Sequence, residues 1–152
     1  METLVLETPI GPVHITANET VIQQITIGEG PSETRETPLL RHAAEQLRAY
    51  FAGTARTFDL PLVPPETPFQ ARVRAAMIAI PYGETRSYGE LANRIDGVAR
   101  AVGQACGHNP VPIIVPCHRV LAAGGAIGGF SGGDGAPTKR KLLAHEAGPL
   151  FV

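Results

Sequence analysis

The stretch NPVPIIVPCHRV, residues 109–120, is the most informative part of this chain. Prolines flank an apolar run, and the cysteine that follows stands directly before a histidine and an arginine. Because proline fixes φ and lacks a backbone donor, the pattern predicts a rigid, extended frame that presents Cys117, His118 and Arg119. Thiolate is the nucleophilic form of cysteine, and an imidazole or a cation nearby lowers a thiol pKa. The stretch is therefore a candidate site for covalent chemistry.

His118 reaches Cys117 only under one of two conditions. Successive side chains of an extended segment point to opposite sides, so either the backbone turns at Cys117 or a water bridges the two groups. A histidine acting as a base also needs an orienting acceptor, and Glu146 is the candidate. From spacing alone, a second interpretation has equal weight, in which Cys117 is a small buried hydrophobe beside a capping histidine.

The cysteine and histidine positions do not favour a metal or a disulfide framework. Two cysteines are too few for a disulfide scaffold. Cys106, His108, Cys117 and His118 lack the paired loops of a structural zinc site. We therefore expect no bound metal.

Three short helices are predicted between residues 67 and 109. A helix over 68–80 begins after the N-cap Thr67, and Ser87 with Glu90 forms a capping box that opens the next helix. A third helix of very small residues covers 99–107. The last two helices, joined by a tight turn, form a helix-turn-helix pattern. An ordinary helical hairpin packed in a core remains the alternative.

The N-terminal part predicts a sheet followed by a helix. Alternating or β-branched runs predict three antiparallel strands at residues 4–7, 13–17 and 21–27. Apolar residues then recur at helical spacing over 38–51, and residues 57–60 are a candidate further strand. The proline-rich segment 61–68 extends neither helix nor sheet and reads as a linker. We place the domain boundary there, with domains at 1–66 and 67–152, and a last helix that stops at Gly148.

Composition and charge narrow the class of protein. The 152 residues are 43% hydrophobic and 18% charged, which is typical of a globular protein and excludes a disordered or fibrous one. No apolar run reaches the roughly twenty residues of a membrane helix. The N-terminus lacks the features of a signal peptide, so we expect an intracellular location.

The net charge of −1 argues against a nucleic-acid binder when it is taken alone. The charge is nevertheless uneven, because residues 1–66 carry −5 and residues 67–152 carry +4. Such an asymmetry indicates a polyanion site on the basic half, and chance scatter is an equal alternative.

A family resemblance adds to these patterns. PCHRV at 116–120, GGFSGG at 128–133 and KLLAHE at 141–146 together resemble the signature of the O6-alkylguanine-DNA alkyltransferases. The similarity covers at least 69–148, and the N-terminal part matches the family's ribonuclease-H-like domain more weakly. The resemblance implies an α+β fold of two domains. A ribonuclease-H-like antiparallel sheet with a helix precedes a mostly helical, winged-helix-like domain that carries the helix-turn-helix.

The resemblance also implies roles for the residues of the candidate site. Cys117 is the alkyl acceptor, His118 is the base acting through a water, and Glu146 orients His118. Asn109 hydrogen-bonds near the thiol. The backbone N–H of Ser131 donates to the guanine oxygen.

Further residues are implied in binding the damaged nucleotide. Arg100 resembles the finger that fills the space of a flipped base, and Tyr88 resembles the tyrosine that promotes flipping. Their alternatives are an ion pair of Arg100 with Asp96 and packing of Tyr88 under the capping box. The glycine-rich stretch 122–135 resembles a lid over the guanine pocket. The apolar walls of that pocket are implied to be Pro112, Val120 and Phe130.

The turn at residues 95–98 is tighter than in some relatives, and two single positions also depart from the family pattern. Relatives often carry a tyrosine where this chain has Phe130, so no phenol is present to donate a hydrogen bond to the guanine. Cys106 stands where relatives often place a larger residue, and we expect it to be structural.

The implied activity is DNA repair by irreversible transfer of an alkyl group from O6 of guanine to Cys117, once per molecule. O4 of thymine is a second candidate position. We expect no cofactor, double-stranded DNA with O6-alkylguanine as the partner, a monomer, no membrane association, and a place in the cytoplasm or nucleoid. The alternatives are a lesion-recognition module without transfer and a Cys-His-Glu thiol hydrolase.

Overall fold

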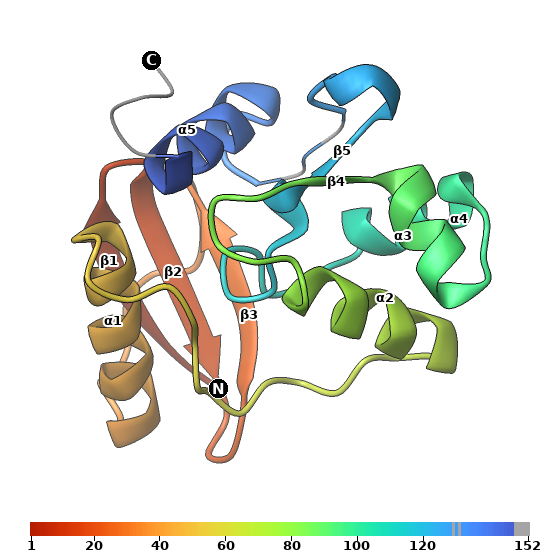
Figure 1. Ribbon diagram of the computed structural model, residues 1–152. Coiled ribbons are helices and arrows are strands. Elements are labelled where there is room, and N and C mark those ends of the chain that lie inside the picture. Colours follow the sequence, from red (N-terminus) through yellow and green to blue (C-terminus); the bar gives the residue numbers. More distant parts are fainter. Residues whose placement is uncertain (129, 131, 148–152) are drawn as a thin grey trace. The chain divides into compact units, whose positions relative to one another are not determined.

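The computed structural model describes residues 1–128, 130 and 132–147 of the chain (Figure 1). It divides into two compact units, Met1–Val63 and Pro64–Val152. Among the described residues, the first unit holds an antiparallel sheet with one helix, and the second holds four α-helices and two very short strands. The α+β fold expected from the sequence is therefore confirmed. None of the helices in the described part has the length and apolar run that a bilayer crossing requires.

The sheet of the first unit is the predicted meander. Strands β1 (Glu2–Thr8), β2 (Gly11–Ala17) and β3 (Ile22–Ile27) pair antiparallel in the order β1-β2-β3. Helix α1 (Pro38–Phe51) begins where Thr37 accepts a hydrogen bond from the backbone of Leu40, and it packs on β1 and β2. The apolar faces of sheet and helix form the core of this unit.

The strand expected at residues 57–60 does not form. The side chain of Gln46 forms hydrogen bonds with both backbone groups of Asp59. It accepts from the N–H over 2.8 Å and donates to the carbonyl over 2.9 Å. Backbone groups satisfied in this way have no need of a strand partner. The contact with the sheet lies further along the chain, where Leu62 makes an isolated parallel bridge to Ile22.

The second unit is mostly helical. Its long elements are α2 (Pro68–Ile78), α3 (Tyr88–Ile95), α4 (Ala99–Gly107) and α5 (Ala136–Ala147). Strands β4 (Arg86–Ser87) and β5 (Val120–Leu121) pair parallel, and 3-10 turns cover Cys117–Arg119 and Ala123–Gly125. Helix α2 ends at Ile78, before the predicted end, and Ile80 is buried beyond it. The stop expected at Gly148 lies outside the described residues.

Helices α3 and α4 form the helix-turn-helix. The capping box is present, because Ser87 accepts from the backbone N–H of Glu90 and the Glu90 carboxylate accepts from that of Ser87. Asp96 ends α3 in the left-handed conformation with φ of 58°. This single residue reverses the chain in a short connection, and Figure 1 shows the two helices packed together.

Candidate functional site

The segment before the cysteine is a closed loop, which corrects the extended frame expected from its prolines. Nδ2 of Asn109 donates to the carbonyl of Val115 over 2.9 Å, and Oδ1 of Asn109 accepts from the N–H of Val111 over 3.1 Å. The chain reverses at Ile113, where φ is 73°. One side chain thus ties both ends of the loop, and the apolar residues between them are buried instead of forming a strand.

The backbone turns at the cysteine. Cys117, His118 and Arg119 form one 3-10 turn after Pro116, and all three side chains are buried. Successive side chains of such a turn do not point to opposite sides, so the turn meets the first of the two conditions set by the sequence. Nε2 of His118 lies 2.7 Å from Oε2 of Glu146 on α5. Because a carboxylate only accepts hydrogen bonds, this geometry places a proton on Nε2.

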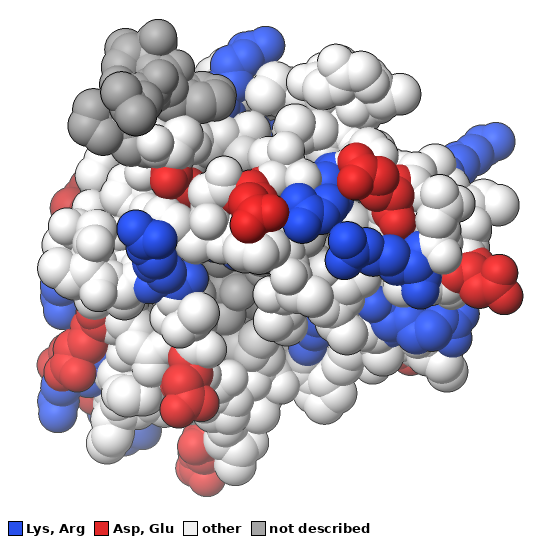
Figure 2. All heavy atoms as spheres, in the orientation of Figure 1, with Lys and Arg blue, Asp and Glu red and all other residues white. Residues whose placement is uncertain are grey.

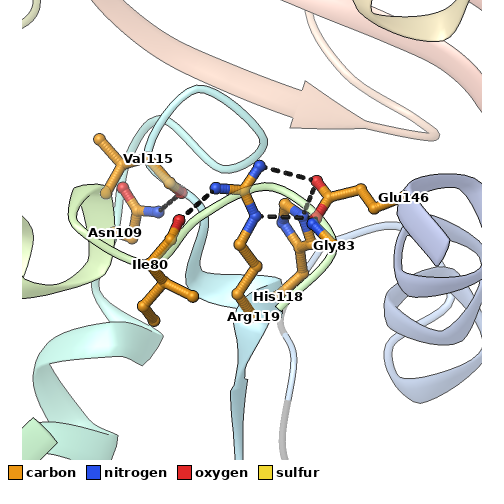
Figure 3. A network of polar contacts seen from close by, with 7 residues as sticks. All are labelled: Ile80, Gly83, Asn109, Val115, His118, Arg119 and Glu146. Atoms are coloured by element: carbon orange, nitrogen blue, oxygen red, sulfur yellow. Dashed lines mark hydrogen bonds and ion pairs between the residues drawn. The ribbon is translucent and has the colours of Figure 1, made fainter. Parts of the chain in front are cut away.

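Glu146 binds the arginine of the turn as well. Nε of Arg119 donates to Oε1 of Glu146 over 2.8 Å and Nη2 donates to Oε2 over 3.0 Å, which makes a forked ion pair (Figure 3). Nη1 of Arg119 donates to the carbonyl of Ile80 over 2.7 Å, beyond the end of α2. The sequence analysis did not predict this ion pair. The network joins the cysteine turn to α5 and to the segment after α2.

Burial opposes charge on both the thiol and the imidazole. It raises the pKa of Cys117, and the side chain of Asn109 and the charge of Lys139 lower that pKa in part. It also lowers the pKa of His118. Nδ1 of His118 has no hydrogen-bond partner among the described residues. The site at rest is therefore a neutral thiol beside a neutral imidazole whose Nδ1 has its lone pair available to take a proton.

Lys139 is a further residue of this site that the sequence analysis did not find. Its side chain is fully buried, and Nζ donates to the carbonyl of Val120 over 2.6 Å. Nζ also lies 5.8 Å from the centre of the Tyr88 ring. The sequence signal that could have revealed Lys139 is its position two helical turns before Glu146, which places both residues on one face of α5.

Tyr88 and Arg100 lie on the helix-turn-helix. Tyr88 is the first residue of α3 and is half-buried, and the charges of Cys117 and Cys106 add to burial in raising its pKa. Arg100 is exposed in the first turn of α4. Within the described residues, no ion pair joins it to Asp96. The structure thus brings Tyr88 to the thiol site and leaves Arg100 on the surface.

The residues expected to wall a pocket differ in exposure. Pro112 and Val120 are buried, and Phe130 is half-buried. Ser131 lies outside the described residues. The glycine-rich stretch approaches Tyr88 closely at Gly128, where a Cβ atom would lie 3.2 Å from the tyrosine hydroxyl. A side chain at this position would be strained at the φ of 70° and would press on the tyrosine ring, so glycine favours the close approach of this stretch to α3.

Cys106 is buried close to the site. Its Sγ lies 3.6 Å from Sδ of Met77. Burial is the main cause that raises the pKa of the Cys106 thiol to about 12. A thiol with this pKa carries almost no thiolate near neutral pH. Over the described part of the chain, no group of three or more His, Cys, Asp or Glu lies together as metal ligands would.

Family models match the chain in two consecutive segments. Residues 2–64 match the 6-O-methylguanine DNA methyltransferase, ribonuclease-like domain. Residues 68–148 match the 6-O-methylguanine DNA methyltransferase, DNA binding domain. The second segment contains the whole thiol site and the helix-turn-helix.

Individual relatives extend over nearly the whole chain. The methylated-DNA--protein-cysteine methyltransferase of Mycobacterium tuberculosis is 47% identical over 149 residues, which cover 93% of this chain and 89% of that protein. The constitutive methyltransferase of the same name from Bacillus subtilis is 41% identical and covers 83% of this chain and 84% of its own length. A crystal structure of Mycobacterium tuberculosis OGT in complex with DNA has a TM-score of 0.85 at 43% identity, covering 97% of this chain and 93% of that one.

Proposed function

The chain belongs to the 6-O-methylguanine DNA methyltransferase family, and we propose that it repairs DNA by moving an alkyl group from O6 of guanine onto Cys117. The observation that carries the proposal is the buried Cys117 in one turn with His118, whose Nε2 is held by Glu146 and whose Nδ1 has no hydrogen-bond partner among the described residues. This arrangement supplies a nucleophile, a base and an orienting carboxylate.

Apart from water, the reaction needs no group from outside the chain and the substrate. The thiol proton of Cys117 passes through a water to Nδ1 of His118, and the sulfur forms a bond with the alkyl carbon. The bond between that carbon and O6 breaks, and its electron pair leaves with the guanine oxygen. The guanine anion then takes up a proton from water, and His118 returns the thiol proton to water. The thioether left on Cys117 is stable, so each molecule reacts once.

Each neighbour of the thiol has a proposed task. Glu146 orients His118 and holds its proton on Nε2. Asn109 shapes the loop by its hydrogen bonds to Val111 and Val115, and its side chain stabilises the thiolate and so lowers the pKa of Cys117. The backbone N–H of Ser131 would donate to the leaving oxygen. Pro112, Val120 and Phe130 would form the apolar walls around the guanine.

The proposed partner is double-stranded DNA with an O6-alkylguanine. A thiol this buried cannot reach a base inside a duplex, so the nucleotide must rotate out of the stack. Arg100, exposed at the start of α4, would fill the vacated space, and Tyr88 would crowd the phosphate beside the target. In the view of Figure 2, Lys and Arg lie among Asp and Glu over α2, α3 and α4. This mixed surface favours selectivity by the flipped base over a large phosphate contact.

The remaining assignments follow from the same proposal. Residues 1–66 would form the ribonuclease-H-like domain with its linker, and residues 67–152 the DNA-binding alkyltransferase domain. The protein would act as a monomer in the cytoplasm or on the nucleoid.

Intact-mass analysis after incubation with a duplex that holds O6-methylguanine tests the proposal. We expect one added methyl group per molecule, and peptide mapping should place it on Cys117. Cys117→Ser should abolish the transfer. Cys106→Ser is the matched control, because the high pKa of Cys106 keeps its thiol unreactive, and this variant should still transfer.

Other outcomes identify the alternatives. Binding of the lesion duplex by the folded wild-type protein with no methyl on Cys117 would indicate a recognition module. Repeated turnover of an ester or amide with release of free enzyme would indicate a thiol hydrolase. Either result would overturn the proposed single transfer.

A further inference from the structure

Arg119 and His118 share one carboxylate. Two nitrogens of the Arg119 guanidinium bond the two oxygens of Glu146 over 2.8 and 3.0 Å, and Nε2 of His118 bonds one of the same oxygens over 2.7 Å (Figure 3). The remaining guanidinium nitrogen is anchored on the carbonyl of Ile80, and the guanidinium carbon lies 5.7 Å from the centre of the Tyr82 ring. Arg119 thus fixes both the position of the Glu146 carboxylate and the net charge that His118 meets.

The charges around His118 compete. A buried carboxylate alone would favour the imidazolium form of a neighbouring histidine. Glu146 indeed raises the pKa of His118, but burial lowers it, and the charges of Arg119 in the same turn and of Lys139 on α5 lower it further. Because the guanidinium is always charged, its contact with Glu146 offsets the carboxylate at every pH of interest.

We propose that Arg119 is a positioning residue that keeps His118 an uncharged imidazole, with its proton on Nε2 and its lone pair on Nδ1, by neutralising Glu146. The inference rests on the proposed function, in which Nδ1 takes the thiol proton. An imidazolium at rest carries protons on both nitrogens and can accept none. Arg119 itself touches no reacting atom and acts only through Glu146 and His118.

The charge state of His118 can be measured without DNA. We would follow the ring nitrogens by NMR against pH in the wild type, Arg119→Gln and Arg119→Lys. Without the guanidinium charge, the midpoint of His118 should rise by about one pH unit or more. Arg119→Lys retains the charge and should stay nearer the wild type. An unchanged midpoint in a folded Arg119→Gln variant would overturn the proposal.

A second pair of variants tests the proposal if Arg119→Gln does not fold. Glu146→Gln leaves the arginine charge beside His118, so the NMR midpoint of His118 should fall below that of the wild type. Arg119→Gln/Glu146→Gln removes both charges, and its midpoint should lie near the wild-type value. An unchanged midpoint in Glu146→Gln would contradict the coupling.

The transfer rate gives a readout that a purely structural role would not produce. With free O6-benzylguanine as the alkyl donor, the pH at which the transfer rate is half-maximal should lie about one pH unit higher in Arg119→Gln than in the wild type, and the two rates should converge above the new midpoint. A loss by one constant factor at all pH values would overturn the proposal. If no variant and no wild type transfers the benzyl group while the NMR midpoints shift as expected, the proposed function fails and the charge coupling stands.

Discussion

Nζ of Lys139 donates a hydrogen bond of 2.6 Å to the backbone oxygen of Val120, the residue that follows the cysteine turn. The hydrogen bond holds an ammonium group in a fully buried position, where its charge lowers the pKa of Cys117. Burial acts in the opposite direction and is the stronger cause. The reactivity of the Cys117 thiol therefore depends on how far the charge of Lys139 offsets the rise in pKa that burial causes.

Replacing Lys139 by methionine should slow the reaction of Cys117 with iodoacetamide about tenfold near pH 7, because a thiol with a higher pKa carries less thiolate. Stopped-flow or mass measurements in a Cys106→Ala background would isolate Cys117. Lys141→Met is the matched control, since Lys141 is exposed on the same helix. Equal rates in Lys139→Met and Lys141→Met would show that Lys139 does not control the reactivity of Cys117.

The stability of the chain should fall in mild acid because of His118. The folded chain holds this side chain neutral with a lowered pKa, whereas the unfolded chain protonates it near the ordinary value of 6.5. Proton uptake then favours the unfolded state, so the free energy of unfolding should drop by about 1.4 kcal/mol for each pH unit below that value, until the folded pKa is reached.

Urea unfolding of the full chain at about pH 7.5 and pH 5 would measure the drop in stability. His118→Gln should show a smaller drop than the wild type, because every other titrating group is common to both. The same drop in both proteins would assign the acid sensitivity to groups other than His118.

Asn109→Ala should destabilise the chain by about 1–3 kcal/mol, because two hydrogen bonds that close the loop before Cys117 would be lost. It should also raise the pKa of Cys117, since the Asn109 side chain lowers it. Unfolding and thiol titration of the same variant check both effects. Asn93→Ala, at an exposed position of α3, should change neither.

Local signals predicted most of the helices and the sheet. Thr67 before Pro68 and the Ser87–Glu90 pair are caps that act within one turn, and the structure has helices at both places. The error at 57–60 came from a distant partner. Gln46 on α1 satisfies the backbone of Asp59, and no local pattern contains that contact.

The residues of the site also divide into those that local signals predicted and those that only the folded structure revealed. Cys117, His118 and Glu146 stood out because their chemistry is recognisable from residue type, and the structure brings the three together. The fork of Arg119 on Glu146 joins residues far apart in the chain, so spacing did not reveal it. Lys139 reads in sequence as one more charged helix residue, and only packing shows that it is buried.

Duplex binding should depend weakly on salt. The basic half of the chain carries only +4, and each neutralised phosphate contributes about −0.9 to the slope of log binding constant against log salt concentration. We expect a slope no steeper than about −4, measured by fluorescence anisotropy with Cys117→Ser to prevent transfer. A much steeper slope would indicate a larger phosphate footprint than the mixed charges of this surface support.

Arg100→Ala should weaken transfer from a duplex more than transfer from free O6-benzylguanine. Arg100 is exposed in the first turn of α4 and forms no ion pair with Asp96 among the described residues, so its removal should leave the thiol site intact. A duplex substrate needs the nucleotide rotated out and the gap filled, whereas the free base needs neither. We expect about a tenfold loss or more on the duplex, with the free-base rate within about twofold of wild type. Arg140→Ala, exposed on α5, controls for the loss of one positive charge, and equal losses on both substrates would contradict the flipping role of Arg100.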